Sequence, residues 1–227
     1  MKPQLFLLHY AGGNCYSFQF LIPYLRDFDV YPLELPGRGK RITEPVLTSF
    51  SEAAQDIYGQ LSAKLNGRRF YIYGHSMGSE LAFMVSYLLE KAGTPPERLF
   101  LTGNPGPGIR ENKYRFKMPY EEFAAELRKL GGVPEEFFEN EELFEFYEPI
   151  IRSDFQIVEE KDVSLEIMIG SPITAIMGTD EEYRDDISNW SRFTRSDFEC
   201  SLYEGDHFFI FDHPARLANV ISNSIYR

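Results

Sequence analysis

The sequence predicts an α/β fold in which a mostly parallel central sheet carries helices on both faces. Short apolar runs recur along the chain, and segments with apolar residues at helical spacing lie between several of them. Strands and helices that alternate in this way form parallel sheets, because each crossover helix returns the chain to the edge where the previous strand began. From about residue 105 to 170 the alternation stops and only helical patterns remain, which predicts an insertion.

Six apolar runs, each followed by turn residues, are expected to form the strands. They are Gln4–Leu8, Val30–Leu35, Arg69–Tyr73, Arg98–Leu101, Ile173–Met177 and Phe198–Tyr203. The segment Ser49–Leu65 is expected to form one of the helices, because its apolar residues share one face. Ser49 and Glu52 also have the spacing of a capping box.

The insertion at about residues 105–170 is expected to form a helical lid over the carboxyl edge of the sheet. Its helical segments are Tyr120–Leu130, Pro134–Phe138 and Glu141–Ile157. Such a segment is more naturally helical than disordered, because its aromatic side chains need a surface against which to be buried. These side chains are Phe123, Phe137, Phe144, Phe146 and Tyr147.

Size, composition and charge restrict the class of protein. The chain of 227 residues suits one domain, so residues 1–227 are expected to form a single unit around one core. The formal charge of -12 disfavours binding to nucleic acid. Cys15 and Cys200 suit a reducing compartment, and the apolar run Leu5–Leu8 is too short to span a membrane. We therefore expect a cytoplasmic protein that does not bind membranes.

The pentapeptide Gly74–Gly78 contains the candidate nucleophile, Ser76. It stands directly between a predicted strand and the helix-like run Ser79–Glu90. A serine on such a sharp turn has a strained backbone, so neighbours without side chains are needed on either side. The turn also places the hydroxyl group at a helix N-terminus, which favours negative charge. This context predicts an α/β-hydrolase fold with Ser76 as the nucleophile.

A serine nucleophile needs a base, and histidine is suited to that role near neutral pH. Three of the four histidines have other expected places: His9 ends the first strand, His75 lies inside the turn, and His213 precedes the last helix. His207 lies in the loop after the final strand, where hydrolases place the base. We expect His207 to be the general base.

The third member of the triad should follow the strand Ile173–Met177. The turn there contains Asp180, Glu181 and Glu182. Either an aspartate or a glutamate can hold a histidine in the required tautomer and stabilise its charged form. The residues alone therefore leave the acid open.

An acyl-transfer site also needs N–H donors for the oxyanion. In this fold one donor is the residue after the nucleophile, here Met77. The second comes from the loop after an early strand, and Tyr10–Gly13 suits that role because its glycines allow a substrate to approach the backbone. Ala11 is the expected donor, with Tyr10 as the next choice.

Six segments, taken together, are typical of one family. They are Tyr10–Gly13, Leu35–Gly39, Gly74–Gly78, Leu130–Pro134, Ile151–Phe155 and Gly205–Phe209. Through them nearly the whole chain resembles type II thioesterases, the stand-alone editing hydrolases of nonribosomal peptide and polyketide synthesis. The PGRG turn, the LGG-x-P segment and the R-x-D-F segment are the most particular to that family.

The resemblance implies a function and a choice of acid. It implies hydrolysis of acyl thioesters from the phosphopantetheine arm of acyl or peptidyl carrier proteins through an acyl-Ser76 intermediate, with no metal and no bound organic cofactor. The family's G-x-x-D spacing falls on Glu181, so the resemblance favours Glu181 over Asp180. Two residues depart from the family pattern: His9 stands where a proline is usual, and Asp206 where a glycine is usual.

Two other functions fit the same residues. A carboxylesterase that acts on small oxygen esters would use the same triad. A hydrolase-fold protein without catalytic activity would use the pocket to bind a ligand, although an intact Ser76 and His207 argue against this.

Two basic stretches near the expected active-site loops are candidates for docking a carrier protein. Because carrier proteins are commonly acidic and this chain has a charge of -12, attraction must be local. The candidate side chains are Arg38, Lys40 and Arg41 in one stretch, and Arg110, Lys113, Arg115 and Lys117 in the other.

Overall fold

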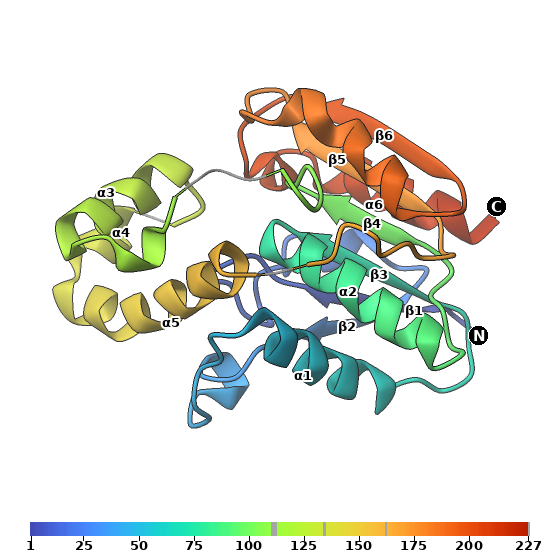
Figure 1. The fold of residues 1–227 in the computed structure, drawn as a ribbon, viewed down its shortest axis with the longest axis horizontal. Helices are drawn as coiled ribbons and strands as arrows, with labels where there is room; N and C mark the ends of the chain where they lie inside the picture. Colours follow the sequence, from blue (N-terminus) through green and yellow to red (C-terminus); the bar gives the residue numbers. More distant parts are fainter. Residues whose placement is uncertain (110–112, 134, 162, 227) are drawn as a thin grey trace.

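A single six-stranded sheet forms the centre of the molecule (Figure 1). The computed structural model describes residues 1–109, 113–133, 135–161 and 163–226. In these residues the strands are β1 (Gln4–Leu8), β2 (Asp29–Leu33), β3 (Phe70–His75), β4 (Leu99–Thr102), β5 (Ile173–Gly178) and β6 (Phe198–Tyr203). All pair in parallel, in the order β2-β1-β3-β4-β5-β6. The predicted α/β class and all the predicted strands are confirmed.

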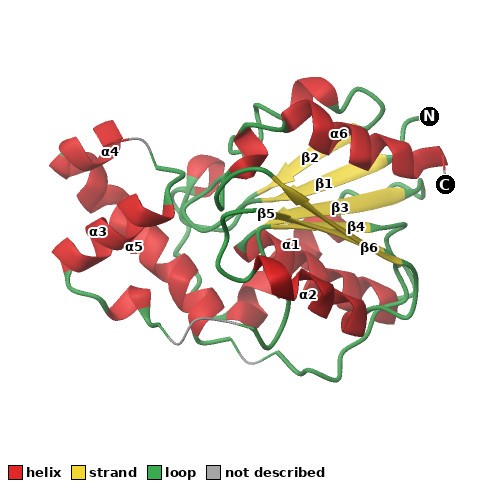
Figure 2. Cartoon of the chain, turned by 90° about the horizontal axis from the view of Figure 1, so that it is seen from above, coloured by secondary structure: helices red, strands yellow, loops and turns green. Residues whose placement is uncertain are grey.

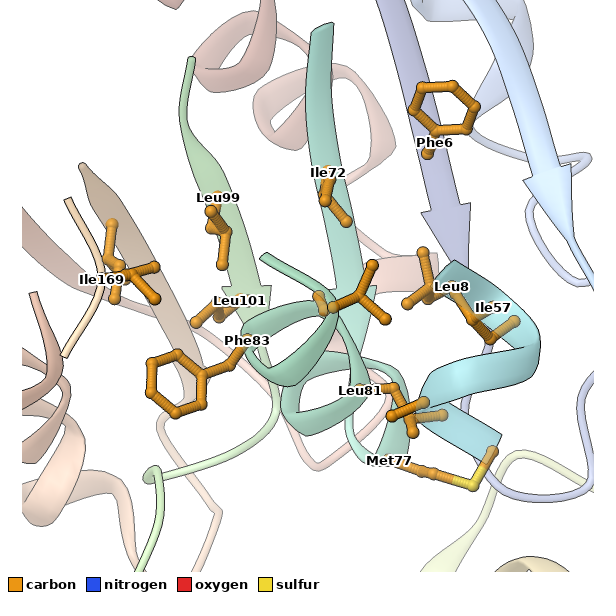
Figure 3. Close-up of a cluster of buried hydrophobic side chains, with 14 of the residues drawn as sticks. Phe6, Leu8, Ile57, Ile72, Met77, Leu81, Phe83, Leu99, Leu101 and Ile169 are labelled. Atoms are coloured by element: carbon orange, nitrogen blue, oxygen red, sulfur yellow. The ribbon is translucent and has the colours of Figure 1, made fainter. Parts of the chain in front are cut away.

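Helices cover both faces of the sheet (Figure 2). Helices α1 (Phe50–Ser62) and α2 (Met77–Lys91) lie on one face, and α6 (Pro214–Asn223) lies on the other. Successive side chains of a strand point to opposite faces, so each buried strand contributes to two cores. In β1, Phe6 and Leu8 pack with Ile57 of α1 and Leu81 of α2, as Figure 3 shows.

The boundaries of α1 follow from its sequence. The Ser49 side chain accepts a hydrogen bond from the Glu52 amide, which supplies the predicted N-cap. The helix ends at Ser62, three residues before the predicted end at Leu65. Across the described ranges, no helix combines the length and the apolar character needed to cross a bilayer.

The insertion between β4 and β5 is helical and lies beyond the carboxyl ends of the strands (Figure 1). Its helices are α3 (Tyr120–Leu130), α4 (Glu135–Glu139) and α5 (Glu141–Glu159). The predicted start of the second helix, Pro134, lies outside the described residues. Phe123 and Phe144 belong to a small core of the insertion itself, whereas Phe146 is 55% exposed, contrary to expectation.

Helix α5 joins the insertion to the body of the molecule. Near its start Phe144 packs in the core of the insertion, and near its end Ile157 belongs to the core that α1 and α2 cover. Pro149 lies within this helix. A proline removes one backbone hydrogen bond from a helix interior. The turn around Pro149, which lies between the two packed ends of α5, therefore has one hydrogen bond fewer than a regular helical turn.

A buried 3-10 segment between β5 and β6 was not predicted. Residues Arg184–Phe193 form turns of 3-10 helix in which Trp190 and Phe193 are fully buried. The Trp190 indole N–H donates to the Asn104 carbonyl group, 2.8 Å away. Such a segment has no sustained apolar period, so hydrophobic periodicity does not predict it.

The strand order determines where a site can form. Strand β2 lies on one side of β1, and β3 lies on the other. The connections that leave the carboxyl ends of β1 and β3 therefore diverge, and open α/β sheets bind ligands in the crevice at this point. The loop Tyr10–Gly13 follows β1, and Ser76 follows β3, so both candidate site segments lie at this crevice.

Candidate active site

Ser76 occupies a strained turn between β3 and α2. Its φ and ψ angles are 55° and -117°, and it is the one non-glycine residue with a positive φ among those that the structure describes. Its amide donates to the Thr102 carbonyl oxygen at 2.8 Å. A Cβ atom at Gly74 would lie 2.1 Å from the Gly78 oxygen, and one at Gly78 would lie 2.2 Å from the Leu8 oxygen. Both glycines are therefore required for the turn.

The structure brings Ser76, His207 and Glu181 together. The His207 Nε2 atom lies 3.0 Å from Ser76 Oγ, and its Nδ1 atom lies 2.7 Å from Glu181 Oε2. A carboxylate accepts, so Nδ1 carries the proton and donates to Glu181. The Nε2 lone pair is then free to accept from the Ser76 hydroxyl group. This is the arrangement in which a histidine can remove a proton from serine.

The turn after β5 directs Glu181, and not Asp180, toward the histidine. The second oxygen of Glu181 accepts from the Gly178 amide at 2.7 Å, which fixes the carboxylate at the end of β5. The side chain of Asp180 instead accepts from the Thr179 hydroxyl group at 3.1 Å. Neighbouring side chains at a strand end point in different directions, so only one of them faces His207.

The remaining histidines have other partners. His75 is fully buried, its Nδ1 atom lies 2.9 Å from Thr102 Oγ1, and burial lowers its pKa well below the usual value. His213 Nε2 donates to the Glu204 carbonyl oxygen at 2.7 Å. Neither ring bonds to Ser76, so the geometry favours His207 as the base.

The amides of Ala11 and Met77 are the candidate oxyanion donors. Met77 is the first residue of α2, directly after Ser76. In the part of the chain that the structure describes, neither amide has an acceptor within the protein. The loop that carries Ala11 closes through a 2.9 Å hydrogen bond from the Gly13 amide to the Tyr10 carbonyl group. Free N–H groups on a fixed backbone can accept a developing negative charge.

Comparison with known proteins identifies the family. The family model described as "Thioesterase domain" matches residues 3–225. The chain belongs to the thioesterase domain family. It is 33% identical to linear gramicidin dehydrogenase LgrE of Brevibacillus parabrevis, over 97% of this chain and 87% of that protein. It is 28% identical to thioesterase PikA5 of Streptomyces venezuelae, over 98% of this chain and 80% of that protein.

A solved structure supports the same family. The chain superposes on ClbQ from the colibactin NRPS/PKS pathway with a TM-score of 0.92 and 27% identity, over 100% of this chain and 98% of that one. The predicted α/β-hydrolase fold and the predicted resemblance to thioesterases are thus confirmed.

A cavity of about 860 Å³ lies over the triad of this thioesterase. Ser76, His207 and the loop Tyr10–Gly13 line one side. Apolar side chains of the insertion line the other, and they include Leu127, Leu130, Tyr147, Ile151, Phe155 and Val158. The pair of Glu80 and Lys161, whose charged atoms lie 2.5 Å apart, also lines the cavity. The volume suits a ligand of medium size held between the sheet and the insertion.

The insertion touches the thioesterase body close to the triad. A Cβ atom at Gly132, whose φ is 79°, would lie 2.2 Å from the ring of Phe208. Phe208 directly follows His207, and its amide donates to the Asp206 carboxylate at 2.7 Å. The glycine therefore allows the loop between α3 and α4 to lie against the segment that holds the histidine. Asp206 stabilises that segment by capping its turn.

Most basic side chains of the two predicted docking stretches are already neutralised. Arg38 is buried against Asp154, and Arg41 pairs with Asp56 and Glu44. In the second stretch the pairs are Lys113–Glu126, Arg115–Glu126, Arg115–Glu159 and Lys117–Glu160. Arg110 lies outside the described residues.

These pairs correct two of the docking assignments. Arg115 is only 8% exposed and holds the insertion together, and Arg38 is buried in the body of the thioesterase. Among the described members of the two stretches, only Lys40 lacks a carboxylate partner. Its ammonium group lies 5.7 Å from the centre of the Tyr16 ring, and Tyr16 lines the cavity.

His9 fastens the loop after β1. Its Nδ1 atom lies 2.8 Å from the Tyr10 carbonyl oxygen, so Nδ1 is the protonated nitrogen. Its Nε2 atom accepts from the Leu35 amide at 3.4 Å. Burial, followed by the nearby charge of Arg38, lowers the pKa of His9 to about 4. A neutral His9 therefore connects this loop to the end of β2, in the place where relatives were expected to have proline.

The contacts of the acid generate the first prediction. Glu181→Gln removes the charge that stabilises the His207 imidazolium and should lower kcat by about 10³- to 10⁴-fold on an acyl thioester. Asp180→Asn is the matched control and should keep kcat within about threefold, because its side chain bonds to Thr179 instead. Steady-state kinetics on both variants decide the matter. A large loss in Asp180→Asn with an active Glu181→Gln would contradict the assignment.

The buried His9 generates the second prediction, on stability. Below its ordinary value of 6.5, histidine binds a proton in the unfolded chain, whereas folded His9 stays neutral down to about pH 4. Wild type should therefore lose about 3 kcal/mol of unfolding free energy between pH 6.5 and 4 through this residue. His9→Asn should lack that loss. Urea titrations at pH values of about 7.5, 5.5 and 4.5 measure the unfolding free energy of both proteins. An unfolding free energy that falls equally with pH in wild type and in His9→Asn would refute the prediction.

Proposed function

We propose that this thioesterase hydrolyses acyl groups from the phosphopantetheine arm of acyl or peptidyl carrier proteins, through an acyl-Ser76 intermediate. The observation that carries the proposal is the hydrogen-bonded series Ser76, His207 and Glu181 at the base of a cavity covered by the helical insertion. The match to ClbQ, which comes from an NRPS/PKS pathway, supports a role in removing acyl groups from such a synthase.

The first half of the proposed reaction forms the acyl-enzyme. His207 Nε2 takes the Ser76 proton while Ser76 Oγ attacks the thioester carbonyl carbon. The Ala11 and Met77 amides donate to the oxyanion, and Glu181 stabilises the imidazolium. The C–S bond then breaks, and His207 gives its proton to the departing sulfur. The products are the carrier thiol and an oxygen ester on Ser76.

The second half restores the enzyme. His207 takes a proton from a water molecule, whose oxygen attacks the ester carbonyl carbon of acyl-Ser76. The same two amides donate to the second oxyanion. The C–Oγ bond breaks, Ser76 recovers its proton from His207, and the carboxylic acid leaves. All proton transfers use protein side chains and water, so we propose that the enzyme needs no metal and no bound organic cofactor.

The insertion supports a substrate delivered on a long, thin arm. Its side chains form one wall of the cavity, and its loop at Gly132 lies against Phe208, next to His207. A thioester at the end of a flexible arm can reach the serine while its carrier stays outside, and contacts with the carrier add binding energy remote from the chemistry.

Lys40 is the proposed contact for an acidic carrier. Its positive charge is exposed beside Tyr16, which lines the cavity, and it has no carboxylate partner within the described residues. A single positive group beside the opening can attract a phosphodiester or an acidic helix even though the whole chain is negative.

The third prediction tests the proposed reaction. Wild type should release acid from acyl-loaded carrier proteins with a higher kcat/KM than from the same acyl group on coenzyme A or on an oxygen ester. Ser76→Ala should lower kcat on the order of 10⁶-fold without loss of folding, because the hydroxyl group contributes little to packing. Intact-protein mass spectrometry of the carrier measures acyl loss. Faster turnover of the matched oxygen ester would refute the proposal and support a carboxylesterase.

The fourth prediction concerns docking. Lys40→Glu should raise KM for acyl-carrier about three- to tenfold and leave kcat unchanged, because it reverses a charge at the periphery of the interaction. The same variant should turn over a short acyl-pantetheine without phosphate at the wild-type rate. Lys64→Glu is the matched control, since Lys64 is exposed after the end of α1, near the first residue of β1. An equal rise of KM in both variants would exclude a local contact at Lys40.

A further inference from the structure

A buried carboxylate from the insertion holds the loop that follows β1. Asp154 of α5 is 0% exposed. Its Oδ2 atom accepts from the Gly12 amide at 2.8 Å, and its two oxygens accept from Arg38 at 2.5 and 2.7 Å. Gly12 is 142 residues away from Asp154 in the sequence. The oxyanion loop is therefore bonded directly to a helix of the insertion.

Arg38 completes the attachment from the other side. It is 1% exposed, and its Nη1 atom also donates to the Gly13 carbonyl oxygen at 3.3 Å. The Gly12 N–H group and the Gly13 carbonyl group are thus both held by one ion pair. Ile151 of α5 packs on the same loop, since a Cβ atom at Gly12 would lie 3.3 Å from its side chain.

These contacts determine where the Ala11 amide points. In a trans peptide the N–H group points opposite to the preceding carbonyl group, so the Tyr10 carbonyl group sets the direction of the Ala11 N–H group. The Gly13 amide and His9 both donate to that carbonyl group. Gly13 and its neighbour Gly12 are in turn held by Arg38 and Asp154. Rotation of the Ala11 amide would require these bonds to break.

We infer that Asp154 is a positioning residue for the oxyanion hole, which it acts upon through its hydrogen bond to the Gly12 amide. The inference rests on the proposed function, in which the Ala11 amide stabilises the oxyanion. It assigns a role to the PGRG turn, which contains Arg38, and to the R-x-D-F segment, which contains Asp154. Neither segment contributes a residue to the triad. It also means that the C-terminal half of α5, which carries Asp154, helps to position the oxyanion loop.

The ion pair is suited to this role on electrostatic grounds. An unpaired carboxylate close to the oxyanion hole would oppose the negative charge that develops there. Arg38 neutralises Asp154 through two hydrogen bonds, so the carboxylate can accept from Gly12 without adding net charge. Removal of one partner alone would leave a buried charge without compensation, so single substitutions are poor tests.

Two double variants isolate the bond to Gly12. R38M/D154N removes both charges and keeps an amide oxygen that can accept from the Gly12 amide. R38M/D154L removes both charges and the acceptor. Both variants lose the Arg38 bond to Gly13, so we expect R38M/D154N to lose about tenfold in kcat and R38M/D154L, which also lacks the acceptor for Gly12, to lose about 100-fold. KM should change little in both, because a misplaced donor acts in the transition state. Ser153→Ala is the control in the same helix, since within the described residues that hydroxyl group bonds only to the Ile150 carbonyl oxygen.

Two further readouts separate positioning from general structural damage. The affinity for a boronic acid, which forms a tetrahedral adduct with serine, should fall by the same factor as kcat. The pH at which kcat is half-maximal should not move, because the triad is intact. Equal kcat values for the two double variants, whether high or low, would overturn the inference. So would a fall in kcat without a fall in boronic acid affinity.

A measurement on wild type covers the case in which R38M/D154L does not fold. By NMR, the Gly12 amide should exchange with solvent about tenfold more slowly than the Ala11 amide, since only Gly12 is hydrogen-bonded. Equal rates would overturn the inference. The boronic acid and exchange measurements need no thioester substrate. If wild type failed to hydrolyse thioesters, the proposed function would fail while these two results still decided the role of Asp154.

Discussion

The strained backbone of Ser76 is the constraint on which the rest of the site depends. A residue in such a region costs about 1–3 kcal/mol, and surrounding structure must hold it there. Here β3 on one side and α2 on the other are packed in the main core, and the Ser76 amide bonds to the end of β4. Because strand and helix are both fixed, the Cα–Cβ bond of Ser76 has one direction, and the partners on the loops after β1, β5 and β6 can be placed relative to it.

Those partners come from loops at one edge of the sheet, and each loop is fixed by its own hydrogen bonds. The Glu181 carboxylate is tied to Gly178, the turn after His207 is capped by Asp206, and the loop after β1 is held by His9 and by Asp154. Catalysis by preorganised groups requires such rigidity, because donors that must reorganise during the reaction lose much of their effect. The sheet and the hydrogen-bonded loops together hold Ser76, His207, Glu181 and the loop after β1 in fixed positions relative to one another.

The sequence predicted the strands and the strained turn at Ser76 well, for physical reasons that are local. Strands buried on both faces appear as continuous apolar runs, and the glycines around Ser76 mark a turn that no other residues allow. The choice between Asp180 and Glu181 depended on family spacing, because either carboxylate can serve a histidine. The pairing of Arg38 with Asp154 spans 116 residues, and the direction of Arg115 depends on two carboxylates of other helices. No local pattern encodes such contacts, so both basic residues were misplaced on the surface.

The most direct test of the account is detection of the acyl group on Ser76 during turnover. A thioester is more reactive than the oxygen ester that it forms with serine, so the intermediate should accumulate before it is hydrolysed. Wild type mixed with an acyl-loaded carrier protein and quenched in acid within milliseconds should gain the mass of the acyl group, located by peptide mapping at Ser76, and the adduct should decay at a rate equal to kcat. Release of the free acid with no such adduct, or an adduct at any other residue, would contradict it.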